Sequence, residues 1–173
     1  MNPHVHSSAP QYYQQKEFIL KSVSLRTLVL AGSLLPVMAQ ASDSQDTWTR
    51  GWGQGVSEFV INGEGQSQLS LSCEDYGSQP ATVIFTDASG HQVSMDEDKS
   101  LQVSIDGGAL IDISESGSRV GGNNLALAWA QLRNGKQVSV TGDGVKDATF
   151  TLAGAAKVLP VFGTHGCVGK DAL

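Results

Sequence analysis

The chain has 173 residues, of which 11 are lysine or arginine and 17 are aspartate or glutamate, so its formal net charge is −6 at pH 7. Without a basic cluster, an acidic chain repels the phosphates of nucleic acids, which excludes a nucleic-acid-binding role. The length suits one domain with a single core once a targeting segment has been set aside.

Residues 16–41 have the three parts of a secretory signal. An apolar run over residues 28–38 follows a positively charged region, and Ala39-Gln40-Ala41 supplies the small residues that a signal peptidase recognises. The run is too short for a membrane anchor, which needs about 20 apolar residues. We expect cleavage after Ala41, no stable membrane anchor afterwards, and a periplasmic or secreted protein. Residues 1–41 are therefore assigned to an N-terminal leader and cleaved signal peptide.

Cleavage at this point removes three basic residues and one acidic residue, which leaves residues 42–173 with a net charge near −8. Residues 42–56 are polar and rich in glycine, and we expect them to form a flexible arm. Trp48 and Trp52 are the only large apolar side chains of this arm. Because exposed tryptophan is costly, docking of both on the domain is favoured over presentation to a partner, which remains the alternative.

From residue 57 onwards, short runs alternate apolar and polar residues between turn signals. A period of two is typical of half-buried antiparallel strands. About eight such strands predict that residues 57–173 form a single all-β domain, an antiparallel β-sandwich or barrel-like fold. The expected strands cover residues 57–61, 69–73, 81–86, 101–105, 109–113, 125–133, 136–141 and 147–152.

Two local signals refine this organisation. Asn134-Gly135 suits the two positive-φ positions of a type I′ turn, which predicts a hairpin joining residues 125–133 to 136–141. The sequence of residues 154–159 predicts one or two turns of a short C-terminal helix before Pro160.

Cys73 and Cys167 are the only two cysteines. An even cysteine count in an exported protein is typical of a disulfide. The alternatives are a reactive thiol or a metal-binding pair, but neither cysteine lies in a CxxC motif or a Cys/His cluster. We predict that the two cysteines are paired.

The sequence contains no recognisable catalytic motif of the GxSxG, HExxH or phosphate-loop kind. His91 and His165 lie in turn-like segments without an accompanying Ser or Asp motif. The acidic segments 96–98 and 143–147 do not have the ligand spacing of a calcium-binding loop. We therefore predict no catalytic residues, no metal and no cofactor, and we expect that the protein is not an enzyme.

A polar segment near the middle of the domain is the second candidate for partner binding. Ser116, Ser118 and Arg119 precede Gly121-Gly122. We expect a flexible loop that presents hydroxyl groups and a cation to a protein partner, in addition to Trp48 and Trp52.

Two segments carry a resemblance to known proteins: Leu69-Ser70-Leu71-Ser72-Cys73, and residues 150–156 together with Leu159 and Cys167. Over residues 67–167 the chain resembles small periplasmic domains that include the invasion-associated locus B family and accessory proteins of type VI secretion. The resemblance implies a strand cysteine paired with a cysteine beyond a short helix across a β-sandwich. It also implies an accessory or binding role without catalytic residues.

Together these features predict an exported periplasmic accessory or binding protein that acts through protein–protein contacts, in envelope or secretion assembly. The alternative is a periplasmic inhibitor of a basic enzyme such as lysozyme. Small size, export, one disulfide and acidity suit the capture of a basic enzyme, and residues 116–119 resemble the Ser/Gly-rich loops that such inhibitors insert into active sites.

Overall fold

The computed structural model describes residues 45–173, so the predicted leader and signal peptide over residues 1–41 lie outside the described residues. The described chain forms two antiparallel sheets and one main helix. The predicted fold class, an all-β sandwich-like domain, is confirmed.

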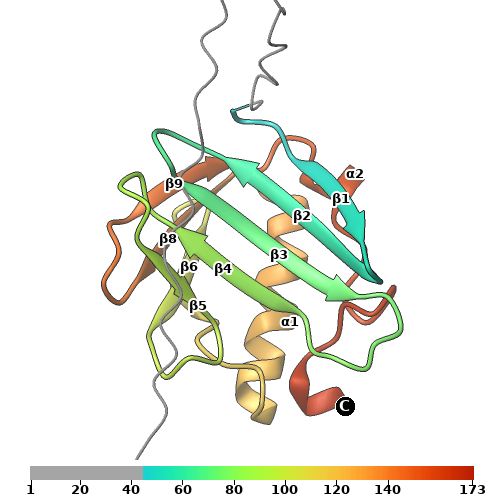
Figure 1. Cartoon of the computed structure of the whole chain (residues 1–173). Coiled ribbons are helices and arrows are strands. Elements are labelled where there is room, and N and C mark those ends of the chain that lie inside the picture. The colour runs from blue at the N-terminus through green and yellow to red at the C-terminus, as the bar shows by residue number, and fades with distance from the viewer. Residues whose placement is uncertain (1–44) are drawn as a thin grey trace, which may run out of the picture. The chain divides into compact units, whose positions relative to one another are not determined.

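A five-stranded antiparallel sheet forms the first layer, and its strands follow one another in chain order (Figure 1). In neighbouring strands, every second residue places its side chain on the buried face of the sheet, as in the pairs Phe59↔Leu71 and Ile61↔Leu69. This is the face that the period of two predicts, because successive side chains of a strand point to opposite sides of the sheet. The strands are β1 (Thr49–Gly53), β2 (Val56–Asn62), β3 (Gln68–Glu74), β4 (Thr82–Thr86) and β5 (Gln92–Ser94).

A four-stranded antiparallel sheet in the order β7-β6-β8-β9 forms part of the second layer. Its central strands, β6 and β8, pair although the main helix separates them in the sequence. The strands are β6 (Leu101–Ile105), β7 (Ile111–Asp112), β8 (Gln137–Gly142) and β9 (Ala148–Thr151).

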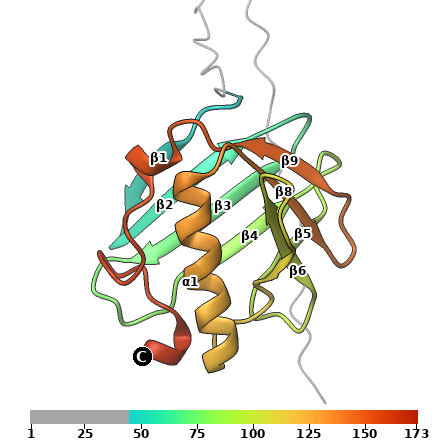
Figure 2. The same cartoon turned by 180° about the vertical axis from the view of Figure 1, so that it is seen from behind.

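Helix α1 (Arg119–Asn134) lies across the five-stranded sheet, beside the four-stranded sheet (Figure 2). The prediction of a strand over residues 125–133 and of a hairpin at Asn134-Gly135 is therefore wrong. The buried residues Leu125, Ala128, Trp129 and Leu132 have the i, i+3, i+4, i+7 spacing of a helix face. Gly135 is the C-cap of this helix: its N–H donates the last bond, to the carbonyl oxygen of Gln131, and its ψ of −178° turns the chain into an extended conformation.

Two aromatic pairs join the layers in the core. Phe59 of β2 meets Trp129 of α1 edge to face, with ring centroids 6.4 Å apart. Phe85 of β4 meets Phe150 of β9 in the same manner at 6.1 Å. One half of the five-stranded sheet thus packs against α1 and the other half against the smaller sheet.

The C-terminal segment is fastened to the sandwich at several points. Helix α2 (Ala155–Val158) forms where a short helix is predicted, and a 3₁₀ helix, η1 (Lys170–Ala172), follows. The predicted disulfide between Cys73 and Cys167 is confirmed, with the two Cα atoms 4.8 Å apart. Trp129 Nε1 also donates to the carbonyl oxygen of Pro160 at 2.9 Å, so α1 holds the segment that leads to Cys167.

The expected arm over residues 42–56 includes strand β1, which pairs with β2 along its whole length. Trp48 precedes this strand and is 4% exposed, and its Nε1 donates to the carbonyl oxygen of Thr151 at 3.0 Å. Trp48 therefore docks on the domain as expected. Trp52 does not, because 68% of it is exposed.

Candidate functional site

The free edge of β1 has a defined hydrogen-bonding pattern. Gln54 and Gly55, both with positive φ, connect β1 to β2 as a two-residue type I′ turn. In such a hairpin the flanking residues Gly53 and Val56 are a hydrogen-bonded pair, and hydrogen-bonded and non-hydrogen-bonded pairs then alternate along the strands. The backbone N–H and C=O groups of Arg50 and Trp52 therefore point away from β2. Within residues 45–173, no backbone hydrogen bond joins β1 to a strand other than β2.

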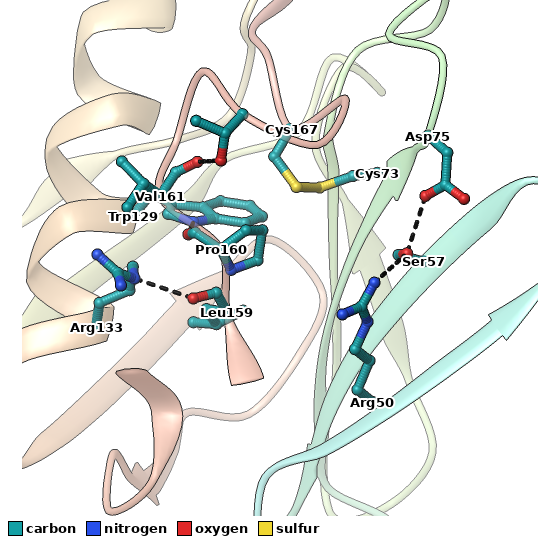
Figure 3. Close-up of a disulfide and its surroundings, with 11 residues drawn as sticks. Arg50, Ser57, Cys73, Asp75, Trp129, Arg133, Leu159, Pro160, Val161 and Cys167 are labelled. Carbon is teal, nitrogen blue, oxygen red and sulfur yellow. Dashed lines mark hydrogen bonds between the residues drawn. A yellow bond between two sulfur atoms is a disulfide. The ribbon is translucent and has the colours of Figure 1, made fainter. Parts of the chain in front are cut away.

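A chain of side-chain hydrogen bonds runs along the inner side of this edge. Arg50 Nη2 donates to Ser57 Oγ at 3.2 Å, and Ser57 Oγ donates to Asp75 Oδ1 at 3.0 Å, next to the Cys73–Cys167 disulfide (Figure 3). The other carboxylate oxygen of Asp75 accepts the indole N–H of Trp52 at 2.5 Å. Trp52 is therefore held in one orientation although most of its surface is exposed.

Arg50 is held by a second contact. Its guanidinium carbon lies 5.7 Å from the centroid of the Phe59 ring, a distance at which a cation and an aromatic ring attract each other. Register places Arg50 opposite Phe59 and Trp52 opposite Ser57, so both side chains project on the core side of the sheet.

The other side of the strand carries few side-chain atoms, because Thr49 projects there together with Gly51 and Gly53. A Cβ atom added to Gly51 or Gly53 would meet no atom within 4 Å. An open hollow of about 530 Å³ borders these glycines, Trp52 and Glu58. We call Arg50, Gly51, Trp52, Gly53 and Asp75 the β1 edge surface. It combines tryptophan and arginine, the residue types that most often dominate binding energy in protein interfaces, with unpaired strand backbone.

The structure separates the five residues predicted to bind a partner. Trp48 belongs to the core, and Ser116 is completely buried. Ser116 Oγ donates to Asp96 Oδ2 at 3.2 Å and accepts the N–H of Lys170 at 3.3 Å, so it fastens the C-terminal 3₁₀ helix and has no surface for a partner.

Ser118 and Arg119 do not form the flexible loop that the glycine-rich pattern predicts. Ser118 is the N-cap of α1, and its Oγ accepts the N–H of Gly121 at 3.0 Å. Arg119 is the first residue of the helix and is exposed. Of the predicted partner-binding residues, only Trp52 belongs to the β1 edge surface.

Arg50, Ser57 and Asp75 of this site were not predicted from the sequence. The available signal was the alternation of Arg50 and Trp52 about Gly51, followed by the turn-forming Gln54-Gly55. The hydrogen-bonded contact with Asp75 had no signal in the sequence, because it depends on the pairing of β2 with β3.

Two other carboxylates, those of Asp87 and Asp106, accept hydrogen bonds from backbone N–H groups of distant segments. Asp87 is completely buried, and its Oδ2 lies 3.2 Å from Nδ1 of His91. Asp106 accepts the backbone N–H groups of Gln137 and Lys136, which hold the pKa of its carboxyl below the usual range. In the part of the chain that the structure describes, no three His, Cys, Asp or Glu side chains converge as a metal site.

Comparison with known proteins identifies a protein family that the chain matches. The family model YfjT matches residues 46–159, which contain all nine described strands and α1. No curated protein and no solved structure matches the chain. Over residues 45–173, none of the helices has the length and apolar character needed to cross a membrane.

Proposed function

The chain belongs to the YfjT family, and we propose that it is an exported accessory protein that binds another polypeptide chain through the β1 edge surface. The observation that carries this proposal is the exposed Trp52, which Asp75 holds in place beside a strand edge that no other strand within residues 45–173 covers. The biological setting that we propose is envelope or secretion assembly.

Export is supported by two features. The Cys73–Cys167 disulfide ties β3 to the C-terminal segment, and structural disulfides persist in oxidising compartments such as the periplasm. The signal-like pattern of residues 16–41 agrees with this assignment. We therefore propose a periplasmic or secreted location.

Binding through the β1 edge surface is supported by the cost of leaving it uncovered. A large aromatic side chain in water gives up the free energy that burial would provide, and unpaired strand edges invite pairing with another chain. The hydrogen bonds of Trp52 and Arg50 restrict both side chains before any partner arrives. Little side-chain entropy then remains to be lost on binding.

The inhibitor alternative has less support from the structure. Small size, export, one disulfide and acidity still agree with it, but the loop over residues 116–119 that it would insert is not there, since Ser116 is buried and Ser118 caps α1. We propose binding at β1 in preference to insertion of that segment into an enzyme.

The test is site-specific photo-cross-linking in cells that produce the full chain. A photoreactive residue at Gly53 occupies space next to the edge, and one at the exposed Asn123 of α1 serves as the control. We expect a polypeptide adduct from position 53 in the envelope fraction, and none from position 123. Trp52→Ala should weaken the adduct, and its complete absence from position 53 would contradict the proposal.

A further inference from the structure

We infer that the partner of the β1 edge is a second copy of this chain, paired strand to strand about a two-fold axis at Gly51. The inference rests on the proposed function, since it names the occupant of the same surface. It is carried by the placement of Arg50 and Trp52 on either side of Gly51, at the centre of β1.

The backbone pattern allows this pairing. The outward N–H and C=O groups belong to Arg50 and Trp52, as the two-residue turn to β2 requires. In an antiparallel pair centred on Gly51, Arg50 of each copy faces Trp52 of the other. Both facing pairs can then exchange their N–H···O bonds, with Gly51 facing Gly51 between them as a non-hydrogen-bonded pair. Such a pair brings its Cα atoms to about 4.5 Å, which the absence of a side chain favours.

The side chains fit the same register. Arg50 and Trp52 project on the same side of β1, so the axis at Gly51 places a guanidinium next to an indole twice. An axis at Arg50 would instead oppose two like charges, which is unfavourable across a strand pair. An interface of this kind is self-complementary, as closed two-fold symmetry requires.

The edge also lacks the features that normally prevent such pairing. Soluble proteins guard their edge strands with outward charges, proline or bulges. The only charge on β1 is that of Arg50, and it is drawn over Phe59 and bonded to Ser57. With five residues, β1 is longer than the outer strands β5, β7 and β9, which have three, two and four residues.

Cysteine cross-linking tests the register. Gly51→Cys places two thiols at the axis, where a separation of about 4.5 Å between Cα atoms permits a disulfide. Gly53→Cys is the matched control, since position 53 lies on the same side of β1 with open space around it. In the proposed register it faces Thr49 of the second copy, so the two introduced thiols stay apart. The native cysteines are buried and paired, so they do not compete. We expect full-length oxidised Gly51→Cys protein to form a reducible dimer on non-reducing gels, and Gly53→Cys to form far less.

A charge-swap series tests the side-chain pairs. Trp52→Arg makes Arg50 of each copy face a second guanidinium, and it should raise the dimer dissociation constant roughly 5- to 30-fold, from the loss of two cation–aromatic pairs. Arg50→Trp combined with Trp52→Arg restores one cation facing one indole at each position, and should recover dimerisation. Sedimentation equilibrium over a range of protein concentrations gives the dissociation constants of the native chain and both variants.

The outcomes separate this inference from the proposed function. A Gly51→Cys adduct with a different polypeptide would leave the proposed function standing and overturn the second copy as partner. A monomer at all concentrations, without a Gly51→Cys dimer, would overturn the second copy as partner. The proposed function would fall as well only if photo-cross-linking from position 53 also gave no adduct. Equal cross-linking at positions 51 and 53, or no recovery in the swapped double variant when the single variant is weakened, would contradict the register at Gly51.

Discussion

The carboxylate of Asp87 accepts the backbone N–H of Lys146 at 3.0 Å and thereby joins the two sheets. Asp87 follows β4 of the five-stranded sheet, whereas Lys146 lies between β8 and β9. The other carboxylate oxygen of Asp87 accepts the N–H groups of Ser89 and His91 at 2.8 and 3.0 Å. The bond from Lys146 is the main cause that lowers the pKa of Asp87. Burial opposes this effect, and the bonds from His91 and Ser89 add to it.

The lowered pKa of Asp87 predicts a dependence of stability on pH. Because the folded pKa lies below the unfolded value of about 3.9, the unfolded chain binds the proton more readily as the pH falls. The stabilising contribution is present above about pH 5 and is lost as the pH falls towards the folded pKa. Asp87→Asn should therefore lower the urea midpoint at pH 7 and flatten its decrease between pH 5 and pH 2. Asp98 is exposed, so Asp98→Asn serves as the control. If the urea midpoint decreased equally between pH 5 and pH 2 in the native chain and in Asp87→Asn, Asp87 would not be the source of the pH dependence.

The disulfide should supply a large part of the stability. It joins Cys73 to Cys167 across a sequence separation of 94 residues and restricts the unfolded chain. We expect the Cys73→Ser/Cys167→Ser double variant to lose about 2–5 kcal/mol of unfolding free energy, measured by urea denaturation. Protein taken from cells should show no free thiol under denaturing conditions. Two titratable thiols would contradict the pairing in the cell, and an unchanged midpoint would show that the core suffices without the bond.

Gly166 should be required for the approach of Cys167 to Cys73. It has a φ of 73°, and a Cβ atom there would overlap the carbonyl oxygen of Glu74. Gly163→Ala is a matched control, because Gly163 has a φ of 85° but open space around it. Gly163→Ala should cost about 1–2 kcal/mol from the left-handed conformation alone. Gly166→Ala should cost more and should slow oxidative refolding; equal losses would show that the contact with Glu74 is not limiting.

Ser118 should contribute to stability as the N-cap of α1. Its Oγ accepts the N–H of Gly121, and removal of such a cap typically costs about 1 kcal/mol. Ser118→Ala should lower the thermal midpoint, whereas Ser118→Asn should retain most of it, because asparagine is also a good cap and adds no charge beside Glu115, whose Oε1 lies 2.6 Å from Ser118 Oγ. Neither change should affect photo-cross-linking from position 53. Loss of the adduct with an unchanged midpoint would instead assign Ser118 to a binding surface.

Much of the sheet structure could be predicted from the sequence. The alternation in residues 57–61, 69–73 and 101–105 is a local property, since a strand with one buried face must alternate. The disulfide was predictable from the cysteine count together with the signal-like segment. The short helix before Pro160 was predictable as well.

Only the tertiary structure decided between helix and strand for residues 125–133. Leu125, Leu127 and Trp129 fit a period of two, while Leu125, Ala128, Trp129 and Leu132 fit a helix equally well. The helix forms because Phe59 and the C-terminal segment cover that second set, which leaves Leu127 49% exposed. The local sequence indicates which side chains are apolar enough to be buried, but the elements that pack against the segment determine which of them become buried.

The same reason explains why Trp48 is buried and Trp52 is exposed, although both tryptophans belong to one polar, glycine-rich segment. The sequence by itself determined that this segment carries two large apolar side chains next to a turn signal. The fold decided that Trp48 reaches the carbonyl oxygen of Thr151 and is buried, whereas Trp52 bonds to Asp75 at the sheet edge and stays 68% exposed. Burial depends on atoms that approach from distant parts of the chain, and these contacts leave no periodic trace in the local sequence.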